Sequence, residues 1–147
     1  KIHTTRHDYA LDSFVLLNPS DQQDYRDMTG LIEHELAETL ARQAPLEAPM
    51  QSRLSRQVKH FPFQPQVSIR PDERGSHYVL SITAVDRTGL LYAIALVLAR
   101  HGVSLQTAKI ATLGERVEDV FLISGRELAH TATLVTIEQE LLAALQV

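Results

Sequence analysis

The stretch Val79–Ser124, which reads VLSITAVDRTGLLYAIALVLARHGVSLQTAKIATLGERVEDVFLIS, decides the fold of this chain. Apolar and polar residues alternate over residues 77–85, which predicts a strand with one buried face. A polar loop at residues 86–89 follows, and the apolar residues after it recur at the spacing of one helix face. The helix positions that we expect to face inward are Leu91, Ile94, Ala95 and Leu98. The helix is also apolar at Leu90, Ala93 and Val97, so we expect two of its sides to be buried.

The second half of the stretch predicts a hairpin. Gly102 is placed to end the helix, and residues 103–113 and 117–124 are strand-like on either side of a turn. A final helix is expected over residues 133–146, where apolar residues again follow helical spacing. Its inward positions are expected to be Leu134, Ile137, Leu141 and Leu145.

A fourth strand is expected from upstream of this stretch. Residues 66–70 alternate polar and apolar, and a turn at residues 72–76 joins them to residues 77–85. A neighbouring antiparallel hairpin is the simplest way to cover an open sheet edge. We therefore expect residues 66–70 to pair with residues 77–85, and residues 66–147 to form one complete module.

The front of the chain predicts fewer elements. Residues 1–5 and 11–17 are strand-like, and an amphipathic helix is expected over residues 22–43. Residues 44–65 contain several prolines and are interpreted as a linker. The front of the chain therefore offers strand, strand and helix, without an opening strand and helix.

These elements form a weak internal repeat. Lys1–Thr4 (KIHT) is similar to Lys109–Thr112 (KIAT), and Asp12–Val15 (DSFV) is similar to Asp119–Leu122 (DVFL), at offsets of 108 and 107 residues. Repeats of this kind identify modular architecture. We therefore expect residues 1–43 to be the second half of a truncated first module.

The composition excludes several classes of function. There are 18 acidic and 14 basic side chains, whereas a nucleic-acid surface needs a basic stripe. There are no cysteines, so disulfides and cysteine-based zinc sites are excluded. No apolar run reaches the roughly 18 residues of a membrane span, and no signal peptide is visible. Because the chain begins at Lys1 rather than Met, we expect a fragment of a longer protein. The lack of cysteines fits the reducing cytoplasm, which is where we expect the chain.

Two segments, residues 79–91 (VLSITAVDRTGLL) and 108–121 (AKIATLGERVEDVF), resemble the C-terminal ACT domains of bacterial PII uridylyltransferase/uridylyl-removing enzymes. Residues 59–62 (KHFP) and 71–75 (PDERG) are similar to the segment between that family's modules. Residues 1–17 are similar to the second half of its first ACT domain. The resemblance covers nearly the whole chain, and the ATLGERVEDVF stretch is the part that is specific to this enzyme group.

The resemblance implies an α+β, ferredoxin-like βαββαβ fold, with an antiparallel four-stranded sheet and two helices on one face. It implies a parent enzyme that attaches UMP to the PII signalling protein and removes it, in nitrogen signalling. The nucleotidyltransferase and hydrolase domains, and the Mg²⁺ that they are expected to use, would lie outside this chain. The ACT region itself would sense L-glutamine and would hold no cofactor and no catalytic group.

The loop at residues 86–89 and the helix start after it are the best candidate ligand site. Such a junction presents unpaired backbone N–H groups and the positive end of the helix dipole, which suit an amino-acid carboxylate. Gly89 would let a ligand approach the backbone closely. The alternative is that Asp86 only caps the helix and Gly89 only makes the turn. The candidate ligand-binding residues are Asp86, Arg87, Thr88, Gly89, Leu90, Leu91, Ser104 and Thr107.

Two of these positions depart from the family pattern. ACT domains usually have proline where Thr88 stands, and proline preorganises the first helical turn. They commonly have asparagine where Ser104 stands, and the hydroxyls of Ser104 and Thr107 offer no amide. The alternative function is therefore a structural or oligomerisation ACT module that binds no ligand. In either case the unburied surface of the half module predicts a homodimer.

Other residue clusters are weaker candidates. The His7-Asp8 dipeptide lacks converging partners, because the other histidines are scattered, so we interpret the histidines as solvated or half-buried. The residues around Glu115–Asp119 are interpreted as a solvated hairpin tip rather than a contact with catalytic domains. There is no G-x-S-x-G elbow and no phosphate-binding loop, so the sequence predicts no catalysis by this chain.

Overall fold

The fold is taken from a computed structural model that describes residues 2–4, 10–12, 25–43, 47–49 and 63–146. The chain divides into two compact units. Phe14–Ala48 form one unit, and Lys1–Ser13 with Pro49–Val147 form the other. The elements are β1 (Ile2–Thr4), β2 (Ala10–Asp12), α1 (Tyr25–Arg42), β3 (Gln66–Pro71), β4 (Tyr78–Val85), α3 (Leu90–Arg100), β5 (Ser104–Lys109), β6 (Thr112–Leu113), β7 (Arg116–Ser124), the 3₁₀ helix η1 (Arg126–Ala129) and α4 (Thr131–Leu145).

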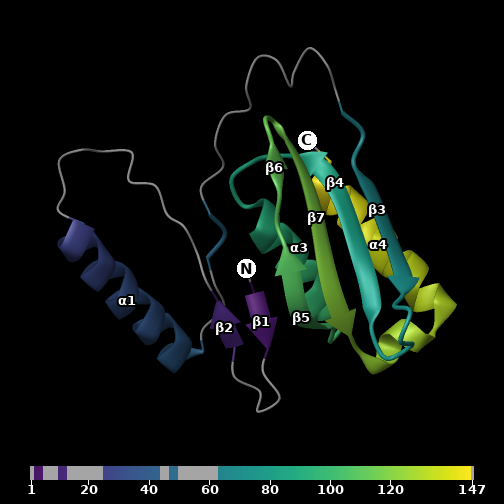
Figure 1. The fold of residues 1–147 in the computed structure, drawn as a ribbon, viewed down its shortest axis with the longest axis horizontal. Helices are drawn as coiled ribbons and strands as arrows, with labels where there is room; N and C mark the ends of the chain where they lie inside the picture. Colours follow the sequence, from purple (N-terminus) through teal and green to yellow (C-terminus); the bar gives the residue numbers. More distant parts are fainter. Residues whose placement is uncertain (1, 5–9, 13–24, 44–46, 50–62, 147) are drawn as a thin grey trace. The chain divides into compact units, whose positions relative to one another are not determined.

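The larger unit is built on an antiparallel sheet with the strand order β2-β1-β5-β7-β4-β3, in which β6 also pairs with β7. Helices α3 and α4 pack on one face of this sheet (Figure 1). The predicted pairing of residues 66–70 is confirmed, because β3 lies beside β4 with Ile69 opposite Leu80. The mixed α and β architecture is compatible with the expected ferredoxin-like fold.

The outer edge of β3 is partly covered by α4. The backbone N–H of Ile69 donates to Oε1 of Glu138 at 2.7 Å. An unpaired N–H on an edge strand is a pairing site for other chains. This side chain therefore satisfies a donor that the sheet leaves open.

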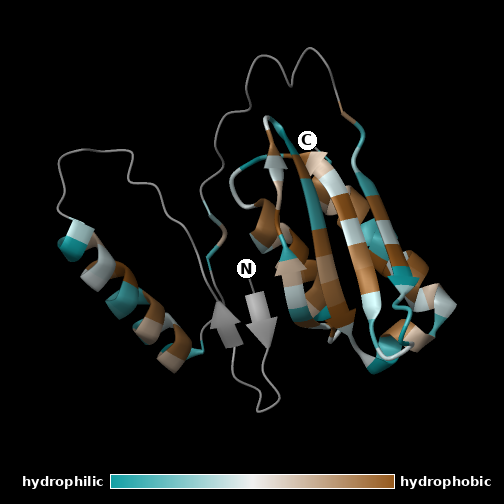
Figure 2. Ribbon diagram, in the orientation of Figure 1, coloured by the Kyte–Doolittle hydropathy of each residue, from teal (hydrophilic) through white to brown (hydrophobic). Residues whose placement is uncertain are grey.

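The core lies between the sheet and the two helices. The predicted alternation in β4 is confirmed, since Leu80, Ile82 and Ala84 are all buried. The apolar positions of α4 are also as predicted, with Leu134 half-buried. The brown, hydrophobic residues of α3 and of the central strands mark this layer in Figure 2. The remaining buried apolar residues of β7 and α4 include Val117, Phe121, Ile123, Ile137, Leu141 and Leu145.

The inward face of α3 differs from the prediction. Leu91 is 43% exposed and Ala95 is also exposed, so their predicted burial is wrong. Because apolar residues lie on more than one side of this helix, spacing alone does not decide which of them face the sheet. The buried positions are Leu90, Ile94, Val97 and Leu98.

Gly102 ends α3 as predicted. It adopts a left-handed φ of 61°, and its N–H donates to the carbonyl of Ala99 at 3.0 Å. The N–H of Val103 donates to the carbonyl of Leu98, also at 3.0 Å. These two bonds form a Schellman motif, in which glycine takes the left-handed position without steric cost.

Strand pairing gives the two copies of the internal repeat matching registers. In the β1–β2 hairpin Thr4 lies opposite Ala10. Shifted by 108 and 107 residues these become Thr112 and Val117, which lie opposite each other between β6 and β7. The two hairpins therefore share one register, and β1 extends the sheet by pairing with the edge of β5.

The predicted domain boundaries at residues 43/44 and 65/66 stay predictions. The sheet joins β1 and β2 to the second predicted module, whereas α1 is the described helix of the smaller unit. The predicted strand 11–17 is observed only at its start, because residues 13–24 lie outside the described part of the chain. Most of the predicted linker, residues 44–46 and 50–62, also lies outside it.

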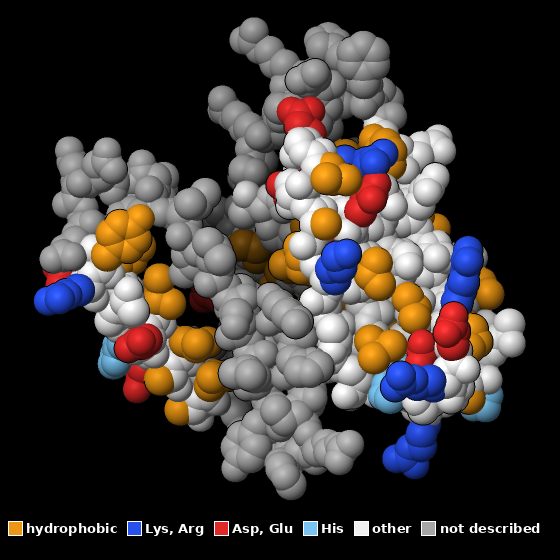
Figure 3. Space-filling model, viewed as in Figure 1, with side chains coloured by type: hydrophobic (Ala, Val, Ile, Leu, Met, Phe, Trp, Pro, Cys, Tyr) orange, Lys and Arg blue, Asp and Glu red, His pale blue; other side chains and the backbone are white. Residues whose placement is uncertain are grey.

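Helix α1 confirms the predicted helix 22–43 over the residues described there. It has no buried residue, and its apolar side chains are visible on the surface in Figure 3. Within the described residues no helix is long and apolar enough to cross a membrane. The exposed apolar residues of α1 are Tyr25, Leu31, Ile32, Leu36 and Leu40.

Candidate functional site

The loop between β4 and α3 is held at both ends by backbone hydrogen bonds. The N–H of Asp86 donates to the carbonyl of Glu115 at 2.8 Å, and Leu90 N–H donates to the carbonyl of Arg87 at 3.2 Å. Gly89 occupies the N-cap position with a left-handed φ of 81°, and no side chain caps this helix. Asp86 therefore does not cap α3, whereas Gly89 does make the turn that the alternative expected.

A cavity of about 280 Å³ opens beside this loop. Its walls come from three elements, namely the loop, the first turn of α3 and the hairpin that joins β5, β6 and β7. This volume suits a ligand smaller than the drug-sized molecules that occupy larger pockets. The lining residues are Asp86, Arg87, Gly89, Leu90, Leu91, Tyr92, Ile110, Thr112, Val117 and Asp119.

Asp119 is the buried polar group of the cavity, with only 1% of its surface exposed. Its Oδ1 accepts a hydrogen bond from the backbone N–H of Ala111 at 3.1 Å. Its Oδ2 is buried and has no hydrogen-bond partner in the described part of the chain. The prediction of a solvated hairpin tip is therefore wrong for Asp119, although Arg116 and Glu118 do form an exposed ion pair there.

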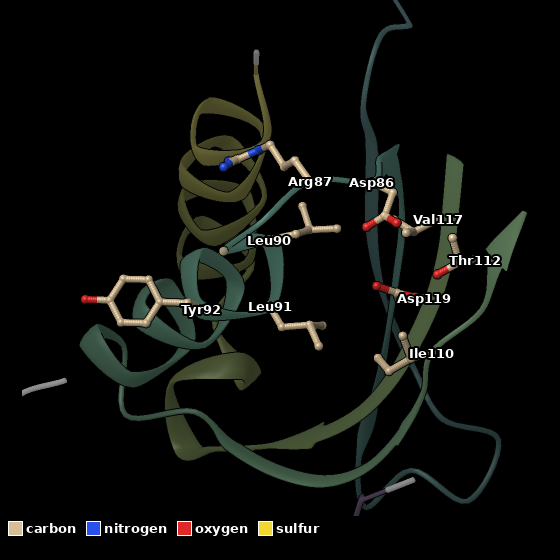
Figure 4. A pocket seen from close by; sticks show the side chains of 10 residues that line it. Asp86, Arg87, Leu90, Leu91, Tyr92, Ile110, Thr112, Val117 and Asp119 are labelled. Carbon is tan, nitrogen blue, oxygen red and sulfur yellow. The ribbon is translucent and has the colours of Figure 1, made fainter. Parts of the chain in front are cut away.

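Burial raises the pKa of Asp119, because desolvation disfavours the charged carboxylate. The hydrogen bond from Ala111 acts against this, and the negative charge of Asp86 adds to it. Figure 4 shows the Asp86 and Asp119 side chains directed into the same space, facing Leu90 and Leu91. The cavity therefore combines two carboxylates at one end with apolar walls and a helix start.

Arg87 lines the cavity with its stem, but its guanidinium is directed elsewhere. Its Nη2 donates to the carbonyl of Ala144 at 2.6 Å, near the C-terminal end of α4. Figure 4 shows the side chain reaching across to that helix. The positive charge of Arg87 thus compensates the negative end of the α4 dipole and ties the loop to α4.

The other predicted site residues fall into two groups. Gly89, Leu90 and Leu91 line the cavity, and Leu90 is also part of the core. Thr88 is an exposed residue of the same loop and does not line the cavity.

Ser104 and Thr107 do not join this group. Ser104 pairs with Ser124 at one end of β7, whereas Val85, just before the loop, pairs with Arg116 at the other end. The length of β7 between these pairs is on the order of 25 Å. One copy of the chain therefore does not bring Ser104 to the cavity beside Gly89.

Sequence analysis missed the residues that the hairpin contributes, above all Asp119. The signal was present, since residues 117, 119, 121 and 123 of β7 share one face and Val117, Phe121 and Ile123 are apolar. An aspartate on this otherwise apolar face of β7 was the indication of a functional side chain. Within the described residues no three histidine, aspartate or glutamate side chains gather in a way that could hold a metal ion.

Comparison with known proteins identifies long relatives that contain a matching segment. A bifunctional uridylyltransferase/uridylyl-removing enzyme of Aromatoleum aromaticum is 61% identical over 147 residues, which is 100% of this chain and 17% of the relative. Enzymes with the same name from Cupriavidus pinatubonensis and Ralstonia nicotianae are 58% and 56% identical over 100% of the chain. The chain spans 17% to 18% of the length of these three relatives. No family model matches the chain, and no solved structure matches it.

Proposed function

We propose that this chain is the C-terminal regulatory region of a bifunctional uridylyltransferase/uridylyl-removing enzyme, and that it senses L-glutamine. Identity of 61% over the whole chain supports a common structure and role with the corresponding segment of the relatives. By the resemblance noted above, the complete enzyme attaches UMP to the PII protein and removes it. Those reactions, and their Mg²⁺, belong to cytoplasmic domains outside this chain.

In this proposal the chain holds one ACT module and the second half of another. The complete module is residues 66–147, in which β3 takes the place of the fourth strand. The half module is residues 1–43, and the matching hairpin registers support its origin as a repeat. The exposed apolar residues of α1 support a packing partner, either a domain of the parent or a second copy in a homodimer.

The observation that carries the sensing role is the cavity beside Gly89. A helix start, apolar walls and a buried carboxylate meet there within about 280 Å³. The helix start suits the carboxylate of an amino acid, and the apolar walls suit its methylene groups. Glutamine would act on the parent by binding one of its states more tightly than the other.

The test is a calorimetric titration of the 147-residue chain with L-glutamine, with L-glutamate as the control ligand. Leu91→Trp should fill the cavity from a half-exposed position, whereas Leu96→Trp adds the same bulk to an exposed position that does not line it. We expect saturable, glutamine-selective binding that only the first variant removes. No heat of binding at millimolar glutamine would contradict the proposal for this chain.

A second candidate is a structural ACT module that binds no ligand. The separation of Ser104 from the cavity favours it, because the Ser104 hydroxyl cannot complete the site within one copy of the chain. In this case sedimentation should report a dimer whose stability glutamine leaves unchanged. Polar substitution at Leu36 and Leu40, both well exposed on α1, should then dissociate that dimer.

A further inference from the structure

Asp119 is a buried carboxylate without a cation. Its Oδ2 has no hydrogen-bond partner among the described residues, and no ion pair of the described residues includes it. The basic groups nearby are used elsewhere, since Arg87 donates to Ala144 and Arg116 pairs with Glu118. The charge that acts on it most from outside is a second carboxylate, Asp86, which has the same sign.

The burial of the Asp119 carboxylate without these partners lowers the stability of the folded chain. A buried charge normally has a partner of opposite sign and a full set of hydrogen bonds. Here one oxygen has a single backbone donor, Ala111, at 3.1 Å, and the other oxygen has none. A buried carboxylate that lacks these partners and lies in a cavity is typical of a binding site.

We infer that the Asp119 carboxylate binds a primary ammonium group, and that this group is the α-ammonium of the amino acid that occupies the cavity. The second part rests on the sensing role proposed above. An ammonium supplies both the missing positive charge and three hydrogen-bond donors. Asp86, at the exposed mouth of the cavity, strengthens the selection for a cation.

The shape of the cavity places the rest of the ligand. With the ammonium at Asp119, the carboxylate of the amino acid reaches the positive end of α3 beyond Gly89. The apolar side chains of Leu91, Ile110 and Val117 line the cavity, and the side chain of the bound amino acid packs against them. The site thus recognises a zwitterion by its two opposite charges.

The first test changes the ligand and leaves the chain intact. L-Glutamine is compared with glutaramate, which is the same molecule without the α-amino group, and L-alanine is compared with propionate. Loss of a charge-assisted hydrogen bond should weaken binding by about 10- to 100-fold. Each amino acid should therefore bind much more tightly than its deaminated counterpart.

The second test changes the protein. Asp119→Asn keeps the size of the side chain and the acceptor for Ala111, but removes the charge. Glu118→Gln removes the same charge from the next residue, whose side chain is exposed and pairs with Arg116. Only Asp119→Asn should lose amino-acid binding by about 10- to 100-fold, while its melting temperature should stay equal to or above that of the wild-type chain.

The outcomes separate this inference from the proposed function. If glutamine binds but glutaramate binds equally well, or if Asp119→Asn leaves its affinity unchanged, the inference is wrong and the sensing role stands. If alanine binds in an Asp119-dependent way and glutamine does not, the inference stands and glutamine sensing is wrong. If none of the four ligands binds, both are wrong. A marked loss of stability in Asp119→Asn would also count against the inference, because it would make Asp119 a structural residue.

Discussion

Arg87 and Ala144 are joined by a hydrogen bond of 2.6 Å from the guanidinium to a backbone carbonyl near the end of α4. The two residues are 57 positions apart, and their contact ties the ligand-site loop to the last helix of the chain. The loop that begins the candidate site is therefore held by a helix that contributes nothing to the lining of the cavity.

This contact predicts that Arg87→Gln destabilises the chain. A hydrogen bond made by a charged group contributes about 1.5–3 kcal/mol, and its loss also leaves a carbonyl at the helix end without this partner. Urea unfolding should report a fall of this size in the free energy of unfolding. The control is Arg74→Gln, which makes the same change at an exposed turn. Equal effects of the two changes would contradict a stabilising role for the contact.

The edge of β3 provides a second prediction. Glu138→Leu removes the acceptor of the Ile69 N–H, and an unpaired, partly buried donor should lower the free energy of unfolding by about 1–3 kcal/mol. Hydrogen exchange at the Ile69 amide should accelerate at the same time. Gln139→Leu, at an exposed position of the same helix, should leave this exchange rate unchanged. An unchanged rate in Glu138→Leu would show that the carboxylate does not protect this edge.

Gly89 and Gly75 form a matched pair for the third prediction. Both have a left-handed φ, of 81° and 70°, so alanine at either position should cost roughly 1–2 kcal/mol. At Gly89 the new Cβ would also lie 2.8 Å from Cγ of Pro49, whereas at Gly75 it would meet nothing within 4 Å. We therefore expect Gly89→Ala to destabilise the chain more than Gly75→Ala.

A double-mutant cycle checks the source of this excess. Pro49→Ala removes the ring atoms that the new methyl group would meet. The excess cost of Gly89→Ala should then disappear, while the cost of its backbone conformation remains. If the excess persists in the Pro49→Ala background, it has another cause.

Asp119 predicts how stability depends on pH. Its folded-state pKa is raised, so the folded chain holds this proton more tightly than the unfolded chain. Protonated Asp119 therefore adds to the free energy of unfolding at low pH. This contribution is lost as the pH rises from the ordinary pKa of a carboxyl group to the raised pKa of the folded chain. At neutral pH the ionised group should thus be a net cost.

Asp119→Asn tests this dependence. The variant should be more stable than the wild-type chain at pH 7, and the difference should shrink as pH falls through the same window. Unfolding midpoints measured from pH 4 to pH 7 give the comparison, with Glu118→Gln as the control because that carboxylate is exposed and paired. A difference that grows toward low pH would mean that the sign of the pKa shift is wrong.

Most of the fold was predictable from local pattern. Alternation identified β4, helical spacing identified α1, α3 and α4, and Gly102 marked a helix end. Even the pairing of β3 with β4 followed, because a short turn between two strands leaves them few other arrangements. Two of the four inward positions of α3, Ile94 and Leu98, were predicted from spacing and the others were not, because apolar residues lie on more than one side of this helix.

The sequence by itself determined which elements form, because strands and helices depend on periodicities of two and 3.6 residues that any short window contains. Only the tertiary structure decided the site. It buried Asp119 beside a loop 30 to 33 residues away, turned Arg87 toward Ala144, and placed Ser104 at the far end of β7. Burial and charge pairing are properties of contacts between distant segments, and these contacts exist only once the sheet and its helices have packed together.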